Sequence, residues 1–83
     1  MGDAIIRAKI YLEDPSGMDA VKEEIGKIVK LQGTSIEELG FGIKILKIVF
    51  IDDEKNGTEE VEGKLSGIPG VSQVEIESVD RAL

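Results

Sequence analysis

The side chains of this sequence that could do chemistry are nearly all carboxylates. The densest run is Asp52-Asp53-Glu54, and Glu59, Glu60 and Glu62 follow it. A calcium loop of the EF-hand type needs oxygen ligands at alternating positions and a distal bidentate glutamate, which this spacing does not supply. A general acid–base pair needs a pocket that shifts the pKa of one carboxyl group, and nothing in the sequence implies such a pocket. We therefore predict a solvated loop and a helix start, with no metal ion, no cofactor and no catalytic residue.

The residue types that are missing exclude further classes of function. The chain has 83 residues, and it contains no cysteine and no histidine. Disulfides, thiolate metal sites and cysteine nucleophiles are therefore excluded, together with the commonest metal ligand and the commonest general base near neutral pH. Among enzymes, only one built on carboxylates stays open.

The net charge of −7, from 10 basic and 17 acidic residues, is spread along the whole chain. Phosphate contacts dominate the affinity of proteins for nucleic acids, so an acidic chain without a basic cluster is a poor direct partner for DNA or RNA. An acidic excess that is spread evenly is explained first by solubility, and second by a preference for a basic partner surface. No apolar stretch reaches the ~20 residues that a membrane span needs, and no signal peptide is recognisable, so we expect a cytoplasmic protein without a membrane partner.

One segment has the features of a contact site. Gly40-Phe41-Gly42 holds a bulky aromatic residue between two glycines, directly before the apolar run of residues 43–51. Phe41 could simply be the first core residue of a strand, which is the usual place of an aromatic side chain in a small domain. A core position rarely needs unrestricted backbone on both sides, whereas an aromatic anchor presented to a partner gains from it. We therefore expect Phe41 to be exposed and to contact a partner together with Gly40 and Gly42.

Hydrophobic periodicity predicts the elements that must position this motif. Alternating apolar residues are typical of a strand, and apolar residues that recur every three or four positions are typical of a helix. In chain order we predict strands at 4–12, 34–39, 43–51 and 71–79, of which the one at 34–39 is short and weak. The first helix follows the first strand, carries the apolar stripe Met18, Val21, Ile25 and Ile28, and stops near Gly33. A polar loop at 52–57 leads to the second helix, at 58–65, which Asn56 or Thr58 caps.

This order, β-α-β-β-α-β, predicts the fold. Two right-handed crossovers place both helices on one face of a four-stranded antiparallel sheet. We therefore expect an α+β, ferredoxin-like sandwich in which residues 1–83 form a single domain and the strands at 4–12 and 43–51 are central. The expected core consists of Ile6, Ala8, Ile10, Val21, Ile25, Leu46, Ile48, Val61, Leu65, Val74 and Ile76.

The face of the sheet that the helices leave uncovered should carry both charged and apolar residues. If the last strand pairs with the first, Arg7 and Lys9 would meet Glu75 and Glu77 there, in exposed pairs that contribute roughly a few tenths of a kcal/mol each. Apolar residues on this face are either a partner surface or leftover strand residues, and the sequence does not distinguish the two. They are Ile5, Ile45, Val49 and Ile51.

The motif and the segments around it resemble one protein family. Gly40-Phe41-Gly42-Ile43-Lys44, followed by Leu46 and Ile48, is similar to the signature of elongation factor 1-beta. The resemblance extends over the whole sequence in the length and register of the archaeal members. It implies a guanine-nucleotide exchange factor that acts on elongation factor 1-alpha in translation elongation. Further matches in the same order are Asp52-Asp53, Val71-Ser72-Gln73 and Val79-Asp80, with the chain ending three residues later.

The resemblance also implies which residues contact the partner. Phe41, with Gly40 and Gly42, corresponds to the glycine-flanked aromatic with which the family docks on its GTPase. A basic residue near the C-terminus of the family reaches toward the magnesium and phosphate site of that GTPase. Here the penultimate residue is Ala82, and Arg81 is the nearest basic candidate.

Strand directions separate these two contacts. The third and last strands both run antiparallel to the first, so their starts share one end of the sheet. Phe41 should then lie at one end, and Arg81 should lie toward the other, in a tail that projects after about Val79. We expect a two-point contact that spans the length of the strands.

A second interpretation gives the same fold a different function. The turn at residues 67–70, Gly-Ile-Pro-Gly, is also found in regulatory domains of this topology that sense small molecules and work as side-by-side dimers. That interpretation predicts a ligand pocket at a subunit interface, whereas the first predicts faster release of GDP from a GTPase. RNA binding through the sheet is disfavoured by the charge and by the presence of only three aromatic residues, Tyr11, Phe41 and Phe50.

Overall fold

The structure, a computed structural model, describes residues 3–53 and 58–81. The possible helix cap Asn56 lies outside these residues. The described part of the chain has the predicted order of strands and helices, with a short 3-10 helix, η1, before the first α-helix. The elements are β1 (Asp3–Leu12), η1 (Pro15–Gly17), α1 (Met18–Ile28), β2 (Lys30–Gly40), β3 (Ile43–Asp53), α2 (Thr58–Ser66) and β4 (Val71–Arg81).

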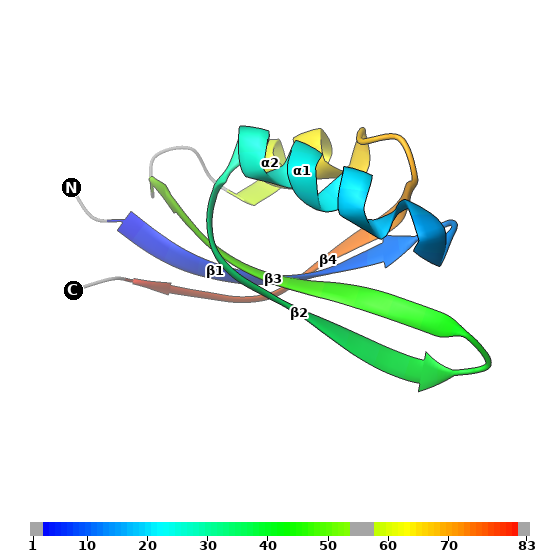
Figure 1. The fold of residues 1–83 in the computed structure, drawn as a ribbon. Coiled ribbons are helices and arrows are strands. Elements are labelled where there is room, and N and C mark those ends of the chain that lie inside the picture. Colours follow the sequence, from blue (N-terminus) through cyan, green and yellow to red (C-terminus); the bar gives the residue numbers. More distant parts are fainter. Residues whose placement is uncertain (1–2, 54–57, 82–83) are drawn as a thin grey trace.

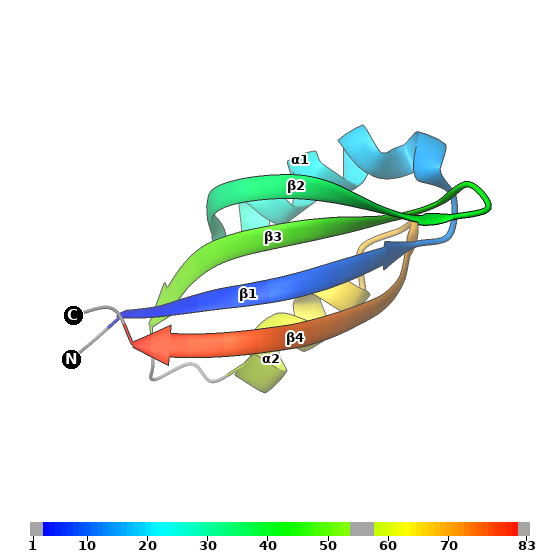
Figure 2. The ribbon, with the colours of Figure 1, turned by 90° about the horizontal axis from the view of Figure 1, so that it is seen from below.

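The strands form one antiparallel sheet in the order β2-β3-β1-β4, and α1 and α2 cover the same face of it (Figure 1 and Figure 2). The ferredoxin-like α+β fold predicted from the sequence is confirmed, with β1 and β3 in the centre. Ile6, Ala8 and Ile10 of β1 face the helices and are buried. The alternate residues of β1, such as Arg7 and Tyr11, lie with their register partners on the uncovered side, which we call the open face.

A hydrophobic core fills the space between the sheet and the helices. In α1 the buried residues are Met18, Val21 and Ile25, which recur at helical spacing. Every residue predicted for the core is buried except Ile76, which is partly buried and packs against it. The structure adds residues that the predicted core omitted, namely Ala4, Met18, Phe50, Ile68 and Val71.

The helix α1 is shorter, and the strand β2 longer, than the sequence predicted. The helix ends at Ile28 rather than near Gly33, and β2 begins at Lys30 rather than at residue 34. Pairing with β3 holds the backbone of β2 from Lys30, opposite Ile51, to Gly40. Most of β2 is exposed and lacks alternating apolar residues, so its local sequence does not reveal a strand that tertiary pairing stabilises.

Strands β3 and β4 also extend further than predicted. β3 continues to Asp53, so Asp52 and Asp53 belong to a strand and not to the predicted polar loop. β4 continues to Arg81, which lies opposite Ala4, so Asp80 and Arg81 do not project from the sheet as expected. β3 and β4 pair with β1 on its two sides, and this pairing supplies the backbone hydrogen bonds that keep these polar residues in strands.

On the open face, Arg7 pairs with a different residue from the one predicted. Its Nη1 atom lies 3.0 Å from Oδ2 of Asp80, so its ion-pair partner is an aspartate rather than the predicted glutamate. The register of β4 shifts between the partners of Arg7 and Ala8, so Ser78 lies opposite Arg7 and Glu77 is skipped in the ladder. Both side chains of the ion pair are largely exposed, so it contributes only about 0–1 kcal/mol to stability.

Lys47 and Tyr11 contact the glutamates of the open face instead. The Nζ atom of Lys47 lies 3.5 Å from Oε2 of Glu37 and 3.9 Å from Oε1 of Glu77. The Tyr11 hydroxyl donates a hydrogen bond of 2.9 Å to Oε2 of Glu75. This bond to a carboxylate is the main reason that the pKa of Tyr11 is raised above its ordinary value of 10.0. These contacts tie the outer strands β2 and β4 to the central strands.

Candidate functional site

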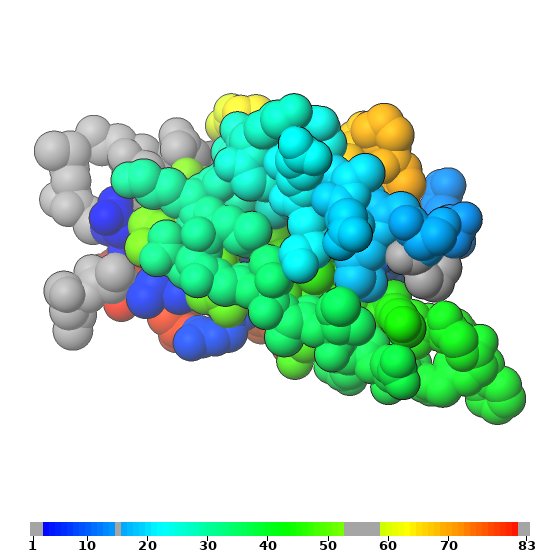
Figure 3. Space-filling view, viewed as in Figure 1, coloured from blue at the N-terminus to red at the C-terminus, as the bar shows by residue number. Residues whose placement is uncertain are grey.

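The β2–β3 hairpin projects beyond the part of the sheet that the helices cover, as the green extension in Figure 1 and Figure 3 shows. The strand pairing ends with Gly40 opposite Ile43, which leaves Phe41 and Gly42 as a two-residue turn. The φ angles of Phe41 and Gly42 are +54° and +76°, and positive values at both positions are what a type I′ turn requires. Gly40, with a φ of +91°, also has a backbone conformation that residues with a side chain rarely adopt. The two glycines therefore permit the tight turn that presents Phe41.

The Phe41 side chain is fully exposed, with a relative accessible surface of 103%. The exposure predicted from the sequence is confirmed, and the alternative of a core position is wrong. The aromatic residue in the core is Phe50, which is 0% exposed and lies opposite Ile6. A left-handed conformation costs a residue with a side chain roughly 1–2 kcal/mol, and strained residues of this kind cluster at functional sites. An exposed ring on a strained turn therefore indicates a contact residue rather than a packing residue.

The second predicted contact residue, Arg81, lies at the opposite end of the sheet. It is the last residue of β4, is exposed, and pairs with Ala4 near the start of β1. Phe41 lies at the other end, past the pair formed by Tyr11 and Ile45. The structure thus does not bring the two predicted contacts together, and their expected separation is confirmed.

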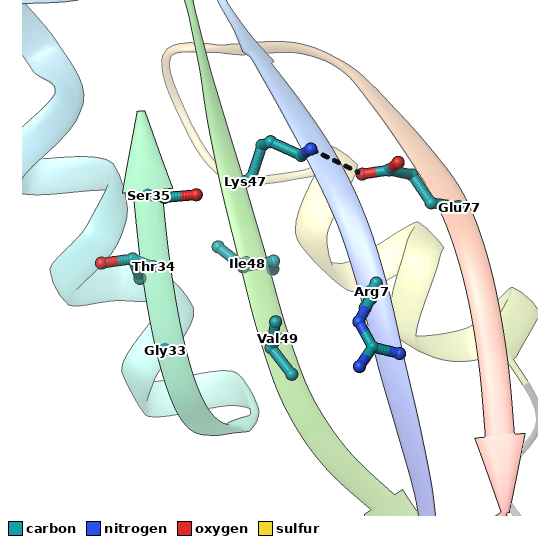
Figure 4. A pocket seen from close by; sticks show the side chains of 8 residues that line it. All are labelled: Arg7, Gly33, Thr34, Ser35, Lys47, Ile48, Val49 and Glu77. Carbon is teal, nitrogen blue, oxygen red and sulfur yellow. Dashed lines mark ion pairs between the residues drawn. The ribbon is translucent and has the colours of Figure 1, made fainter. Parts of the chain in front are cut away.

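The middle of the open face contains a shallow groove of about 350 Å³ (Figure 4). Gly33 opens this groove because it has no side chain and lies opposite Val49. Lys47 and Glu77 reach toward each other across β1 at its side. The turn at residues 67–70, on which the small-molecule-sensing interpretation depends, does not line the groove. The lining residues are Arg7, Gly33, Thr34, Ser35, Lys47, Ile48, Val49 and Glu77.

The hairpin has the features of a protein contact site. Within residues 3–53 and 58–81, no cluster of three or more acidic, histidine or cysteine side chains could hold a metal ion. Over the same residues, no helix is long and apolar enough to cross a membrane. What the hairpin offers is an aromatic ring in a defined position, and such rings are enriched among the residues that dominate protein interfaces.

Comparison with known proteins identifies the family. Residues 5–82 match the EF-1 guanine nucleotide exchange domain. The chain belongs to this family. It is 33% identical to elongation factor 1-beta of Methanocorpusculum labreanum over 86 residues, and 36% identical to elongation factor 1-beta of Methanothermobacter thermautotrophicus over 90 residues, with 100% of each chain covered in both comparisons. Elongation factor 1-beta of Staphylothermus marinus is 34% identical, with 98% of each chain covered. The family resemblance stated from the sequence is confirmed.

Two apolar residues beside Phe41 were not among the predicted contact residues. Leu39 and Ile43 are 51% and 52% exposed, respectively. Ile43 begins the apolar run of β3, and such a run predicts a buried strand without showing where the covering helices end. The only local signal for these residues was their position next to the glycines of the turn.

Proposed function

We propose that this protein accelerates the release of GDP from elongation factor 1-alpha during translation elongation in the cytoplasm. Its membership of the EF-1 guanine nucleotide exchange domain family supports this function. The main structural support for the proposal is the full exposure of Phe41 in the turn of a projecting hairpin. In this proposal residues 1–83 act as a single exchange domain, without a cofactor and without direct contact to nucleic acid or membrane.

Nucleotide exchange of this kind follows from thermodynamic linkage. A protein that binds the nucleotide-free GTPase more tightly than the nucleotide-bound form must weaken nucleotide binding by the same factor. No covalent bond is made or broken in the process. A sequence without cysteine and histidine is therefore no obstacle to the activity, because the protein only has to present contact residues in defined positions.

The turn positions Phe41 before the partner arrives. The two-residue turn is closed by the pairing of Gly40 with Ile43, so the backbone has few alternative conformations. A phenylalanine side chain has only two rotatable bonds, and ordering it costs little entropy. Contact residues that are already positioned lose less free energy on binding than flexible ones. Phe41 is therefore suited to be the main anchor on the GTPase.

Arg81 is the proposed second contact. Its guanidinium group is the type of side chain that pairs best with phosphate, in line with the role that the family resemblance implies for a basic residue near the C-terminus. It stands one position before Ala82, which occupies the penultimate place. Arg81 and Asp52 both lie opposite Ala4, so the strand residues from Ile43 to Asp52 separate the two contacts. At roughly 3.3 Å per residue this is about 33 Å, so the GTPase must follow most of the length of the sheet.

Nucleotide release tests the proposed function directly. Elongation factor 1-alpha would be loaded with fluorescent GDP and chased with excess unlabelled nucleotide, with and without this protein at micromolar concentration. We expect a dissociation rate of GDP that rises with the concentration of the protein. An unchanged dissociation rate would refute the function.

A further inference from the structure

Exposed apolar side chains are concentrated on the β2–β3 hairpin. Within the described part of the chain, five large apolar residues are exposed, and four of them lie between residues 36 and 43. Soluble proteins rarely expose apolar residues in such a cluster unless a partner covers them. Phe41 is thus the most exposed member of a larger apolar surface and not an isolated ring. The other three are Ile36, Leu39 and Ile43, with relative exposures of 53%, 51% and 52%.

The register divides these side chains between the two faces of the hairpin. Ile43 lies two residues before Ile45, the partner of Tyr11, and therefore belongs to the open face. Leu39 is skipped in the ladder between Glu38 and Gly40, so Leu39 and Gly40 together oppose Ile43 in a β-bulge. Leu39 lies two residues after Glu37, which is opposite Ile45 on the open face, so strand alternation places Leu39 on the same face as Ile43.

Ile36 lies on the other face of the same hairpin. Its register partner is Leu46, which is buried under the helices at 0% exposure. Ile36 itself is 53% exposed, which shows that the helices cover Leu46 but do not extend to the outer strand at this point. The hairpin therefore presents Ile36 on the helix side and Ile43 on the open side, with almost equal exposure.

The layout of the fold favours the open face as the side that a partner contacts. Both helices stand on the other face, above the middle of the sheet, whereas the open face runs without interruption from the hairpin to the end of β4 (Figure 1 and Figure 2). A partner bound at Phe41 can follow the open face as far as Asp80, which lies opposite Ile5 on this face, without crossing a helix. Arg81 lies opposite the buried Ala4, on the helix side, so the partner would reach it at the end of the sheet. The next open-face residue of β3, Ile45, lies between Tyr11 and Glu37 and is only 2% exposed, so the exposed apolar surface is confined to the hairpin.

We propose that Leu39 and Ile43 form, together with Phe41, one apolar surface that docks on the GTPase through the open face of the hairpin. The inference rests on the proposed exchange function. The partner surface should be an apolar patch with a basic rim, because the chain carries a net charge of −7. Ile36 should stay outside the contact.

Two isoleucines of equal exposure on opposite faces supply a matched experiment. Ile43→Thr and Ile36→Thr each replace an ethyl group by a hydroxyl group, and both keep a β-branched side chain that suits a strand. We expect Ile43→Thr to lower the apparent kcat/KM for GDP release about tenfold, which corresponds to about 1.4 kcal/mol. Ile36→Thr should stay within about twofold of the unmodified protein, because its side chain is expected to remain in water. Equal losses in the two variants, or a larger loss with Ile36→Thr, would overturn the inference.

Further arms of the experiment separate the possible failures. Leu39→Ser, at a position without a ladder partner, should repeat the loss if Ile43→Thr proves unstable in thermal unfolding. If the unmodified protein does not accelerate GDP release, the proposed function itself fails. If it does and the two isoleucine variants behave alike, only the assignment of the face fails.

Sedimentation of the protein alone should show a monomer, because a dimer that Ile43→Thr dissociates would mean that a second copy covers this surface.

Discussion

The covered part of the sheet and the projecting hairpin are built from the same kinds of residue, but one is core and the other is surface. Leu46 and Ile36 lie opposite each other on the same face, and their exposures are 0% and 53%. The two phenylalanines repeat this contrast, since Phe50 is 0% exposed and Phe41 is 103% exposed. Coverage by neighbouring elements and side chains, not the type of residue, therefore decides whether an apolar side chain stabilises the fold or remains available to a partner.

The comparison predicts its largest effect for Phe50. Phe50→Ala should lower the free energy of unfolding by about 3–5 kcal/mol, because it removes a fully buried ring and leaves a cavity among well-packed neighbours. Equilibrium unfolding in urea measures the change. A loss below about 1 kcal/mol would mean that the core around Phe50 is less tightly packed than the structure indicates.

Phe41→Ala should reduce exchange activity strongly and change stability little. We expect the apparent kcat/KM for GDP release to fall about thirtyfold, the factor that corresponds to the loss of about 2 kcal/mol at an interface anchor. The free energy of unfolding should change by less than about 0.5 kcal/mol, since the ring is fully exposed. Fluorescent GDP release and urea unfolding of the same preparation give both numbers. A stability loss as large as that of Phe50→Ala would mean that Phe41 is a core residue, and would remove the basis of the proposed function.

Removal of Arg81-Ala82-Leu83 tests the other end of the sheet. We expect GDP release to slow by about threefold to tenfold, the usual range for an exposed charged contact, while the domain stays folded. Pairing of β4 with β1 would still run from Val71 to Asp80, so most of the ladder remains. Arg81→Gln is the matched control, because it removes the charge and leaves the chain length unchanged. Full activity of both variants would leave Phe41 as the sole proposed anchor.

The smallest expected effect concerns the backbone of the turn. Phe41→Asn should raise the free energy of unfolding by about 0.5–1 kcal/mol, because asparagine tolerates a positive φ and Asn-Gly is a preferred pair in type I′ turns. The same variant should lose exchange activity as Phe41→Ala does. Thermal unfolding and GDP release together would show that the strained phenylalanine is kept for contact rather than for stability. A variant no more stable than the parent protein would contradict the strain inferred from the φ of +54°.

Local patterns determined much of this protein. The alternation in β1 assigned Ile6, Ala8 and Ile10 to the core, and the spacing in α1 assigned Val21 and Ile25. These assignments need only the period of one element, because a side chain's direction repeats every 2 residues in a strand and every 3.6 in a helix. The glycines around Phe41 likewise predicted a tight turn with an exposed ring, because few other residues adopt positive φ angles.

What the tertiary structure decided depends on partners far away in the sequence. The strand character of β2 from Lys30 onward comes from pairing with β3, and the partner of Arg7 on the open face is set by a register shift in β4. Neither pairing leaves a mark in the local sequence. The exposure of Ile36 depends on where the helices stop covering the sheet, and that of Leu39 and Ile43 on their place in the projecting hairpin. Strand register and helix coverage are long-range properties, so only the folded chain shows which apolar residues are left for a partner.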